Sequence, residues 1–340
     1  MRAPYSGIPL PGWVGVRPPH RHEESEVTQA ARAAAADPAG TGSQSSVPVD
    51  ASGMPHGQPV LDRLVALLDL EPIEENIFRG VSPAESPVRV FGGQVAGQAL
   101  VAAGRTVPSE RRVHSLHAYF LRPGDPSVPI VYQVDRTRDG RSFTTRRVVA
   151  VQHGKTIFSL SASFQVEERG MDHAEPMPEV PAPEELPTYG ERLGDLAGEV
   201  GGMANLPRPI DMRHVTEPPW LSREDGPRDA RSRVWMRADG DLPDDDLLHV
   251  CLLAYASDLT LLDSVLARHG VYWGVDQVHG ASLDHAMWFH RRFRADEWFL
   301  YDCSSPSASG ARGLATGNFF SRDGSLIATV VQEGLLRVED

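Results

Sequence analysis

The chain has 340 residues, enough for two domains of ordinary size, and its 41% hydrophobic and 23% charged residues are typical of a soluble globular protein. The formal net charge of −13 argues against a nucleic-acid partner, because neutralising phosphates requires clustered Lys and Arg. The longest apolar run, residues 250–256, is too short for a membrane span, which needs about 20 residues. We therefore expect neither nucleic-acid binding nor a membrane span.

Residues 1–57 are rich in Ala, Pro, Gly, Ser and His and have no sustained hydrophobic periodicity. Such a segment cannot bury enough apolar surface to offset the entropy lost on ordering, so we predict a disordered N-terminal extension. Its prolines and its acidic residues Glu23, Glu24 and Glu26 do not fit a secretory or transit signal.

The segment 58–166 is predicted to form a helix followed by an antiparallel sheet. Apolar residues at helical spacing from Leu61 to Leu68 indicate an amphipathic helix. A second helix is predicted at residues 91–104, where small side chains should let a sheet pack closely. Strand-like segments separated by turns follow at residues 114–121, 130–137, 142–152 and 156–166.

Residues 167–205 are rich in Pro, Glu and Gly and are predicted to be a semi-rigid linker. The second unit, residues 206–340, contains a predicted helix at 247–266 whose first part is apolar on nearly every side around Asp258. An ionised carboxylate in such a place costs several kcal/mol unless it is hydrogen-bonded or takes part in chemistry. Strands are predicted at residues 233–237, 281–289, 297–304, 309–321 and 326–338.

The second unit repeats the order of elements of the first. A single offset of 170 residues places Gly140 on Gly310 and Gly154 on Gly324, both in predicted turns. Upstream, Ser-Leu-His-Ala at 115–118 recurs at 282–286 with one inserted residue. The two units are therefore predicted to be copies of one fold.

Several long stretches resemble the acyl-CoA thioesterase II family, including Phe-Gly-Gly-Gln-Val-Ala-Gly-Gln at 91–98 and Asp-His-Ala-Met-Trp-Phe-His at 284–290. Further matching stretches lie at residues 67–75, 114–125, 255–259 and 331–334. The resemblance implies an α+β chain of two fused hotdog folds, each a long helix wrapped by a curved antiparallel sheet. It also implies hydrolysis of fatty acyl-CoA to free acid and CoA.

The resemblance also implies a site, because family members hold the attacking water with an Asp, a Thr or Ser, and a Gln. These positions fall on Asp258, Ser282 and Gln332. The residue types suit the chemistry, since a thioester carbonyl needs only a positioned, partly deprotonated water and stabilisation of the developing oxyanion. From composition alone, Asp258 could equally be a hydrogen-bonded structural acid, and Gln332 an outward residue of the last strand.

The first unit lacks this set. By the offset Gln332 corresponds to Ala162, and by the helix match Asp258 corresponds approximately to Gln98, so we predict one water site per chain. The first unit should instead supply a backbone N–H that polarises the thioester carbonyl, because helix N-termini favour negative charge. Gly97 and Gln98 are the candidates.

Other side chains have alternative interpretations. A nucleophilic Ser282 with His285 as its base is disfavoured, because residues three apart on a strand point to opposite faces. His114 is a candidate for substrate binding, with a hydrogen-bonded structural imidazole as the alternative. CoA phosphates could meet one of two arginine groups, Arg138, Arg141, Arg146 and Arg147, or Arg291, Arg292, Arg294 and Arg312.

The leading hypothesis is a thioesterase for medium- to long-chain acyl-CoA. The sequence has neither a His-Glu-x-x-His zinc motif nor a phosphate-loop signature, so we expect no metal and no organic cofactor. The alternatives are a non-catalytic acyl-CoA sensor on the same scaffold and, less favoured, a hydratase, since no His follows Asp258 before His269.

We expect a cytoplasmic protein. Cys251 and Cys303 lie in apolar segments without metal or disulfide spacing, which indicates reduced core residues. The sequence ends in Val338-Glu-Asp340 rather than in a peroxisomal Ser-Lys-Leu address. The family resemblance implies a homo-oligomer.

Overall fold

The computed structural model describes residues 47–50, 52–83, 89–194, 207–219, 229–271, 273 and 278–338. Most of the predicted N-terminal extension, residues 1–46, lies outside them. The last part of that extension is packed on the folded body: Met54 is buried, and the Gly57 N–H donates to Asp239 Oδ2 at 2.6 Å. The compact unit therefore begins at Val47.

The first half contains two helices and an antiparallel run of strands within the described residues. Its helices are α2 (Gln58–Leu68) and α3 (Gly92–Gly104). Its strands are β1 (Glu71–Glu74), β2 (Ile77–Gly80), β3 (Arg111–Phe120), β4 (Ile130–Asp139), β5 (Phe143–Gln152) and β6 (Lys155–Val166). The short helices η1 (Pro183–Glu185) and α4 (Tyr189–Leu193) follow in the linker.

The second half repeats this plan with two helices in the place of α3. Its helices are α5 (Asp246–Ser257) and α6 (Asp263–His269). Its strands are β7 (Ile210–His214), β8 (Arg231–Ala238), β9 (Val278–Ser282), β10 (Asp284–Phe289), β11 (Phe299–Ser309), β12 (Arg312–Ser321) and β13 (Leu326–Val338). Helix α6 packs on β8, β11 and β12, as α3 packs on β2, β4 and β5, so α5 and α6 together take the place of α3.

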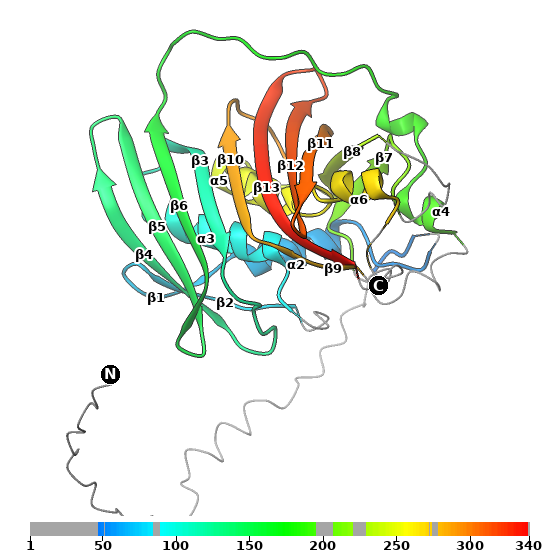
Figure 1. Cartoon of the computed structure of the whole chain (residues 1–340). Coiled ribbons are helices and arrows are strands. Elements are labelled where there is room, and N and C mark those ends of the chain that lie inside the picture. The colour runs from blue at the N-terminus through cyan, green and yellow to red at the C-terminus, as the bar shows by residue number, and fades with distance from the viewer. Residues whose placement is uncertain are drawn as a thin grey trace, which may run out of the picture. The chain divides into compact units, whose positions relative to one another are not determined.

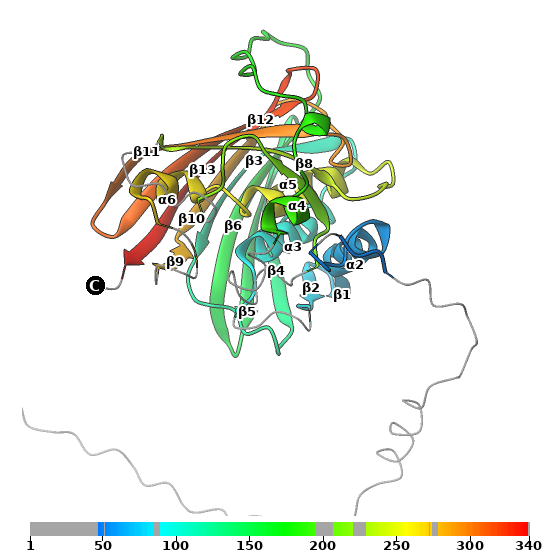
Figure 2. The same cartoon turned by 90° about the vertical axis from the view of Figure 1, so that its right-hand side faces the viewer.

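The strands of both halves form one curved antiparallel sheet, in the order β1-β2-β4-β5-β6-β3-β10-β13-β12-β11-β8-β7, with β9 also paired to β13. The halves join where β3 pairs with β10, for example Leu116 with Met287. Figures 1 and 2 show α3 and α5 on the concave side of this sheet. A helix wrapped by a curved sheet in each half is the double hotdog fold that the resemblance implied.

The glycines of α3 face helix α5. A Cβ on Gly93 would lie 2.4 Å from the Tyr255 carbonyl oxygen, and one on Gly104 would lie 2.5 Å from Leu247 Cδ1. Helices α3 and α5 are therefore antiparallel and very close, so that the start of α3 meets the end of α5. Helix α3 also packs against β4, β5 and β6, so the predicted packing of a sheet on this helix is confirmed.

The linker covers part of the outer face of the C-terminal sheet. Figure 1 shows it crossing from β6 to α4. The Trp235 indole N–H donates to the Pro181 carbonyl at 2.9 Å. A small apolar cluster forms beneath the linker from Trp235, Trp298, Leu300 and Phe320, with Met177, Val180 and Leu186 packed against it. This segment thus has a defined position on the sheet.

Candidate active site

The three side chains implied by the family resemblance meet at one point, although they lie 24 and 50 residues apart. Asp258 Oδ1 accepts hydrogen bonds from Ser282 Oγ at 3.2 Å and from Gln332 Nε2 at 2.9 Å. Gln332 Nε2 also donates to Ser282 Oγ at 2.6 Å. We call Asp258, Ser282 and Gln332 the polar cluster.

Asp258 reaches the cluster because α5 ends there. The predicted helix 247–266 is in fact two helices, and Asp258 is the C-cap of α5, with φ −90° and ψ 1°. Asp245 starts the helix by accepting hydrogen bonds from the N–H groups of Leu247 and Leu248. The carboxylate is therefore half-buried at a helix end instead of enclosed by the apolar middle of a long helix.

Ser282 reaches the cluster because the predicted strand 281–289 is broken. β9 ends at Ser282 and β10 begins at Asp284, whose Oδ1 accepts the Glu333 N–H at 2.7 Å and holds the bend. The alternation expected of one strand therefore does not apply, and Ser282 and His285 both contact Gln332. Gln332 lies between them, so the two side chains do not form the Ser–His pair that the sequence also disfavoured.

One carboxylate oxygen of Asp258 is turned toward the first half. A Cβ on Gly92 would lie 2.5 Å from Asp258 Oδ2 and 3.0 Å from a ring carbon of Phe120. Gly92 is the first residue of α3, so the open oxygen lies beside a helix N-terminus. The N–H groups of a first helical turn have no acceptor within the helix and carry partial positive charge.

Aromatic side chains surround this point of contact. Phe91 and Tyr255 meet edge to face with ring centroids 5.1 Å apart, and Phe120 and Phe158 lie 5.0 Å apart. Burial, together with the nearby charge of Asp258, raises the pKa of Tyr255 to about 12. Tyr255 therefore remains a neutral phenol at physiological pH and is no candidate for a general base.

A buried chain of hydrogen bonds lies behind the cluster. Gln332 Oε1 is 2.8 Å from His285 Nδ1, and His285 Nε2 is 2.8 Å from Ser257 Oγ. All three side chains are at most 1% exposed. Burial lowers the pKa of His285, an effect that the charge of Asp258 opposes. The sequence suggests His285 only as a base and does not reveal this role, although His285 stands inside the matched stretch 284–290.

The three predicted substrate-binding residues lie elsewhere. A Cβ on Gly97 would touch Cys251 O and Leu68 Cδ2, each at 3.2 Å. Gln98 is fully buried, and its amide donates to Leu67 O and accepts from Tyr132 OH, each at 2.7 Å.

His114, the third of these candidates, is half-buried and hydrogen-bonds Ser163 Oγ at 2.9 Å, and burial lowers its pKa. The part of these three residues in substrate binding stays a prediction. The glycine that borders Asp258 is Gly92, which the sequence signals only as part of the pair opening the helix.

The two helices end in different residues. Asp258 caps the C-terminus of α5, and Arg105 caps that of α3. Arg105 forms an ion pair with Asp69 and donates to the Leu70 carbonyl. The approximate correspondence of Asp258 with Gln98 stays a prediction.

Most of the candidate CoA-binding arginines are engaged within the chain. Arg146 is 1% exposed and hydrogen-bonds Thr106 and Asp139. The whole second group is ion-paired: Arg291 with Asp172, Arg292 with Glu167, Arg294 with Asp296, and Arg312 with Glu333. Arg138, Arg141 and Arg147 are exposed.

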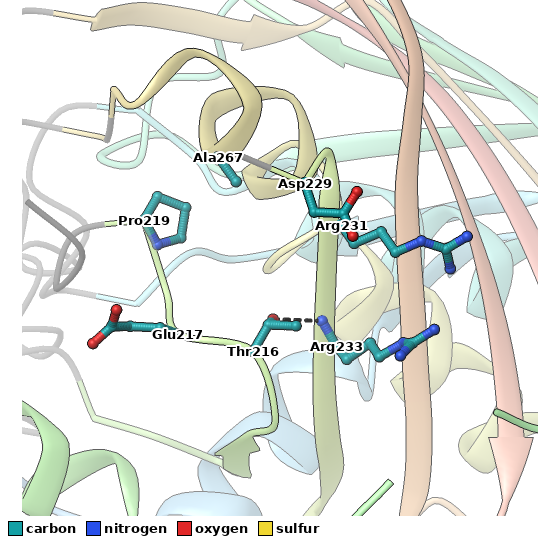
Figure 3. A pocket seen from close by; sticks show the side chains of 7 residues that line it. All are labelled: Thr216, Glu217, Pro219, Asp229, Arg231, Arg233 and Ala267. Carbon is teal, nitrogen blue, oxygen red and sulfur yellow. Dashed lines mark hydrogen bonds between the residues drawn. The ribbon is translucent and has the colours of Figure 1, made fainter. Parts of the chain in front are cut away.

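A pocket of about 210 Å³ lies away from the polar cluster and shares no residue with it. Its lining residues are Thr216, Glu217, Pro219, Asp229, Arg231, Arg233 and Ala267. Figure 3 shows the Arg231 and Arg233 side chains extending to the same side, away from Glu217. Both pair with Asp302, and the Arg233 N–H donates to Thr216 Oγ1 at 2.9 Å. Arg231 and Arg233 thus form ion pairs within the chain.

Two further features concern metal ions and membranes. The described residues contain no group of three His, Cys, Asp or Glu side chains placed to hold a metal ion. None of the helices in the described parts of the chain has the length and apolar character needed to cross a membrane.

Both halves of the chain are similar in sequence to known proteins. Residues 204–335 match the model of the acyl-CoA thioesterase family, and residues 82–165 match that of the acyl-CoA thioesterase N-terminal domain. Acyl-coenzyme A thioesterase 8 of Homo sapiens is 41% identical, over 81% of this chain and 89% of the relative. An acyl-CoA thioesterase II of Mycobacterium marinum of known structure is 47% identical, over 82% of this chain and 99% of that one, with a TM-score of 0.67.

The fold has a further match in a hotdog protein of Alicyclobacillus acidocaldarius, which is 21% identical, over 82% of this chain and 99% of that one, with a TM-score of 0.64. The fold and the matches over both halves define a thioester hydrolase of the hotdog class. The chain belongs to the acyl-CoA thioesterase II family.

Proposed function

We propose that the chain hydrolyses medium- to long-chain fatty acyl-CoA by direct attack of a water held by Asp258, Ser282 and Gln332. The observation that carries this proposal is the meeting of the three side chains within 3.2 Å of one another. Two donors occupy Asp258 Oδ1, which fixes the carboxylate and leaves Oδ2 for the proton of a water.

The reaction then needs no covalent enzyme intermediate. The water oxygen bonds to the thioester carbonyl carbon while its proton passes to Asp258. The carbon–sulfur bond breaks, and the CoA thiolate takes the proton back from Asp258. The products are the free fatty acid and CoA, and the carboxylate is regenerated.

The N-terminus of α3 supplies the second requirement of the reaction. Oxyanion stabilisation by fixed N–H donors is often the largest single contribution to acyl transfer. The first turn of α3 lies beside Asp258 Oδ2 at Gly92, so its N–H groups replace those of Gly97 and Gln98 in this role. The aromatic side chains around Gly92 offer apolar surface to the start of the acyl chain.

The test is thiol release from palmitoyl-CoA by the wild type and by Asp258→Asn. The Asn side chain keeps the shape but cannot accept the proton, so kcat should fall by about 10²–10⁴-fold. Asp69→Asn, which changes an exposed acid of the first half, should keep the wild-type rate. Equal rates in the wild type and Asp258→Asn would remove Asp258 from the mechanism.

The sensor hypothesis makes a different prediction in the same experiment. A sensor would bind palmitoyl-CoA saturably in calorimetry and release no thiol, even in the wild type. A scan of acyl-CoA chain lengths then tests the proposed preference for medium and long chains. The cytoplasmic location and the homo-oligomeric state remain predictions, and light scattering of the purified chain tests the second.

A further inference from the structure

Resting on the proposed function, we infer that His285 is a positioning residue that fixes the orientation of the Gln332 amide through the chain Ser257–His285–Gln332. Among the described residues, His285 hydrogen-bonds one member of the polar cluster, Gln332. Its two ring nitrogens each have one partner, Gln332 Oε1 and Ser257 Oγ, both at 2.8 Å.

The hydrogen bonds determine which nitrogen of His285 carries the proton. Gln332 Oε1 is an acceptor only, so His285 Nδ1 must donate to it. Burial lowers the pKa of His285, so the ring is neutral and its Nε2 has a lone pair. His285 Nε2 then accepts from Ser257 Oγ, whose single hydroxyl proton is shared with the Ala254 carbonyl, also 2.8 Å away.

Every donor in the chain therefore points toward Asp258. Ser257 donates to His285, His285 to the Gln332 oxygen, and the Gln332 nitrogen to Asp258 and Ser282. If the amide were rotated by half a turn, its oxygen would lie against the carboxylate oxygen, and its nitrogen would face the N–H of His285. Both contacts would be repulsive.

His285 matters most after the water has given up its proton. While Asp258 is ionised, it holds the amide nitrogen by itself. Once Asp258 is protonated it can donate a hydrogen bond, and the oxygen end of the amide would suit it as well as the nitrogen end. At that stage, His285 Nδ1–H is the group that keeps the Gln332 nitrogen directed at the reacting atoms.

The first half shows that the fold does not need this pair. Leu116 and Ala162 pair across β3 and β6, and Ala162 is the residue that the repeat aligns with Gln332. In the second half, His285 precedes Ala286, which pairs with Val331 across β10 and β13. A buried His and Gln in place of Leu and Ala stabilise a fold only if every polar atom is paired.

The test is a double-mutant cycle of His285→Leu and Gln332→Ala, read as kcat and KM for palmitoyl-CoA. Gln332→Ala alone should lower kcat about 30-fold, as expected for removal of a fixed polar contact, and His285→Leu alone about 10-fold with KM within about twofold. In the Gln332→Ala background, His285→Leu should change kcat by less than about twofold, because no amide is left to orient.

Two further variants separate positioning from packing. His285→Asn can place an N–H where Nδ1 lies and should recover kcat to within about threefold of the wild type. His249→Leu removes another buried histidine, which accepts the Ala295 N–H at 3.1 Å outside the cluster. Any loss from His249→Leu should be equal in both Gln332 backgrounds.

The outcomes distinguish the inference from the proposed function. If Gln332→Ala leaves kcat unchanged, the role proposed for Gln332 is wrong, and the inference falls with it. If Gln332→Ala lowers kcat but His285→Leu lowers it by the same factor in both backgrounds, only the inference is overturned. If His285→Leu does not fold, the cycle is run with Ser257→Ala, and equal losses in both backgrounds overturn the inference in the same way.

Discussion

In the N-terminal half Leu116 faces Ala162 across β3 and β6, whereas in the C-terminal half the corresponding strands β10 and β13 carry His285 and Gln332. The strand order from β4 to β11 is the same when read from either end. By strand pairing and burial, His285 takes the place of the buried Leu116, not of the exposed His117 with which the sequence repeat aligns it. The helix ends differ in the same way, with Arg105 on α3 and Asp258 on α5.

This difference shows which residues serve the fold and which serve the site. In the first half, the apolar pair Leu116 and Ala162 is enough for the sheet to pack on the helix. A buried imidazole and amide carry a desolvation cost of about 1–3 kcal/mol for each polar group left unpaired. The second half offsets that cost with a complete hydrogen-bond chain that ends at Asp258.

Among the variants that probe the difference between the halves, the largest loss of activity is expected when the second half is given the buried pair of the first. The double variant His285→Leu, Gln332→Ala should lose about 30-fold in kcat, as Gln332→Ala alone does, because one fixed polar contact is removed. It should still unfold cooperatively, since Leu116 and Ala162 occupy the equivalent positions in a folded half. Thiol release and urea unfolding followed by circular dichroism measure the two properties.

An unfolded double variant would break the comparison, because the second half would then need its polar pair to fold. Gln332→Leu, which fills more of the volume, is the matched control for the cavity that Ala leaves. It should be as inactive as Gln332→Ala but more stable.

A smaller effect is expected at the contact between the halves. Gly92→Ala would place a methyl group 2.5 Å from Asp258 Oδ2 and 3.0 Å from Phe120, so the carboxylate or the helix must move. We expect kcat/KM to fall about tenfold, the size of effect that a small displacement of reacting groups produces. Thiol release at several substrate concentrations measures it.

Gly97→Ala is the matched control on the same helix. Its Cβ would contact Cys251 O and Leu68, both at 3.2 Å, away from the cluster. It should lower stability slightly and leave kcat near the wild-type value. The opposite ranking, with Gly97→Ala inactive and Gly92→Ala active, would restore the assignment made from the sequence.

The sequence predicts the fold well because the fold depends on repeated local signals. Glycine-containing hairpins at one offset and two matched sets of strand segments are enough to indicate two copies, and the family resemblance names the hotdog fold. The resemblance also names Asp258, Ser282 and Gln332, which the structure brings together.

The rest of the site has no local signal. Residues 259–262 are as apolar as the helix before them and contain neither Gly nor Pro, so the end of α5 at Asp258 is not readable from periodicity. The approach of Gly92 to Asp258, and the place of His285 behind Gln332, are contacts between distant segments. The helix match alone points to Gly97 and Gln98. Both lie more than one helical turn after Gly92, the residue that borders Asp258.

The last expected effect is on stability rather than on activity, and it concerns the start of α6. Asp263 begins α6, is buried, and accepts the Trp273 indole N–H at 2.8 Å. Burial raises the pKa of Asp263 to about 7 from its ordinary value of 3.8. The folded state then binds more protons than the unfolded state between these two pH values, so this residue makes stability fall as pH rises from about 4 to about 7.

Asp263→Asn keeps an oxygen for Trp273 and removes the titration, so its advantage over the wild type should grow across that pH range and level off above about pH 7. The advantage is at most about 4 kcal/mol in the free energy of unfolding, from about three pKa units at 1.36 kcal/mol each. Urea unfolding of both proteins at pH 5 and pH 8 measures this difference. Asp69→Asn, at an exposed ion pair, should give a curve nearly parallel to that of the wild type. If Asp263→Asn differs from the wild type by the same amount at both pH values, Asp263 is already ionised in the folded protein, and the start of α6 carries no buried proton.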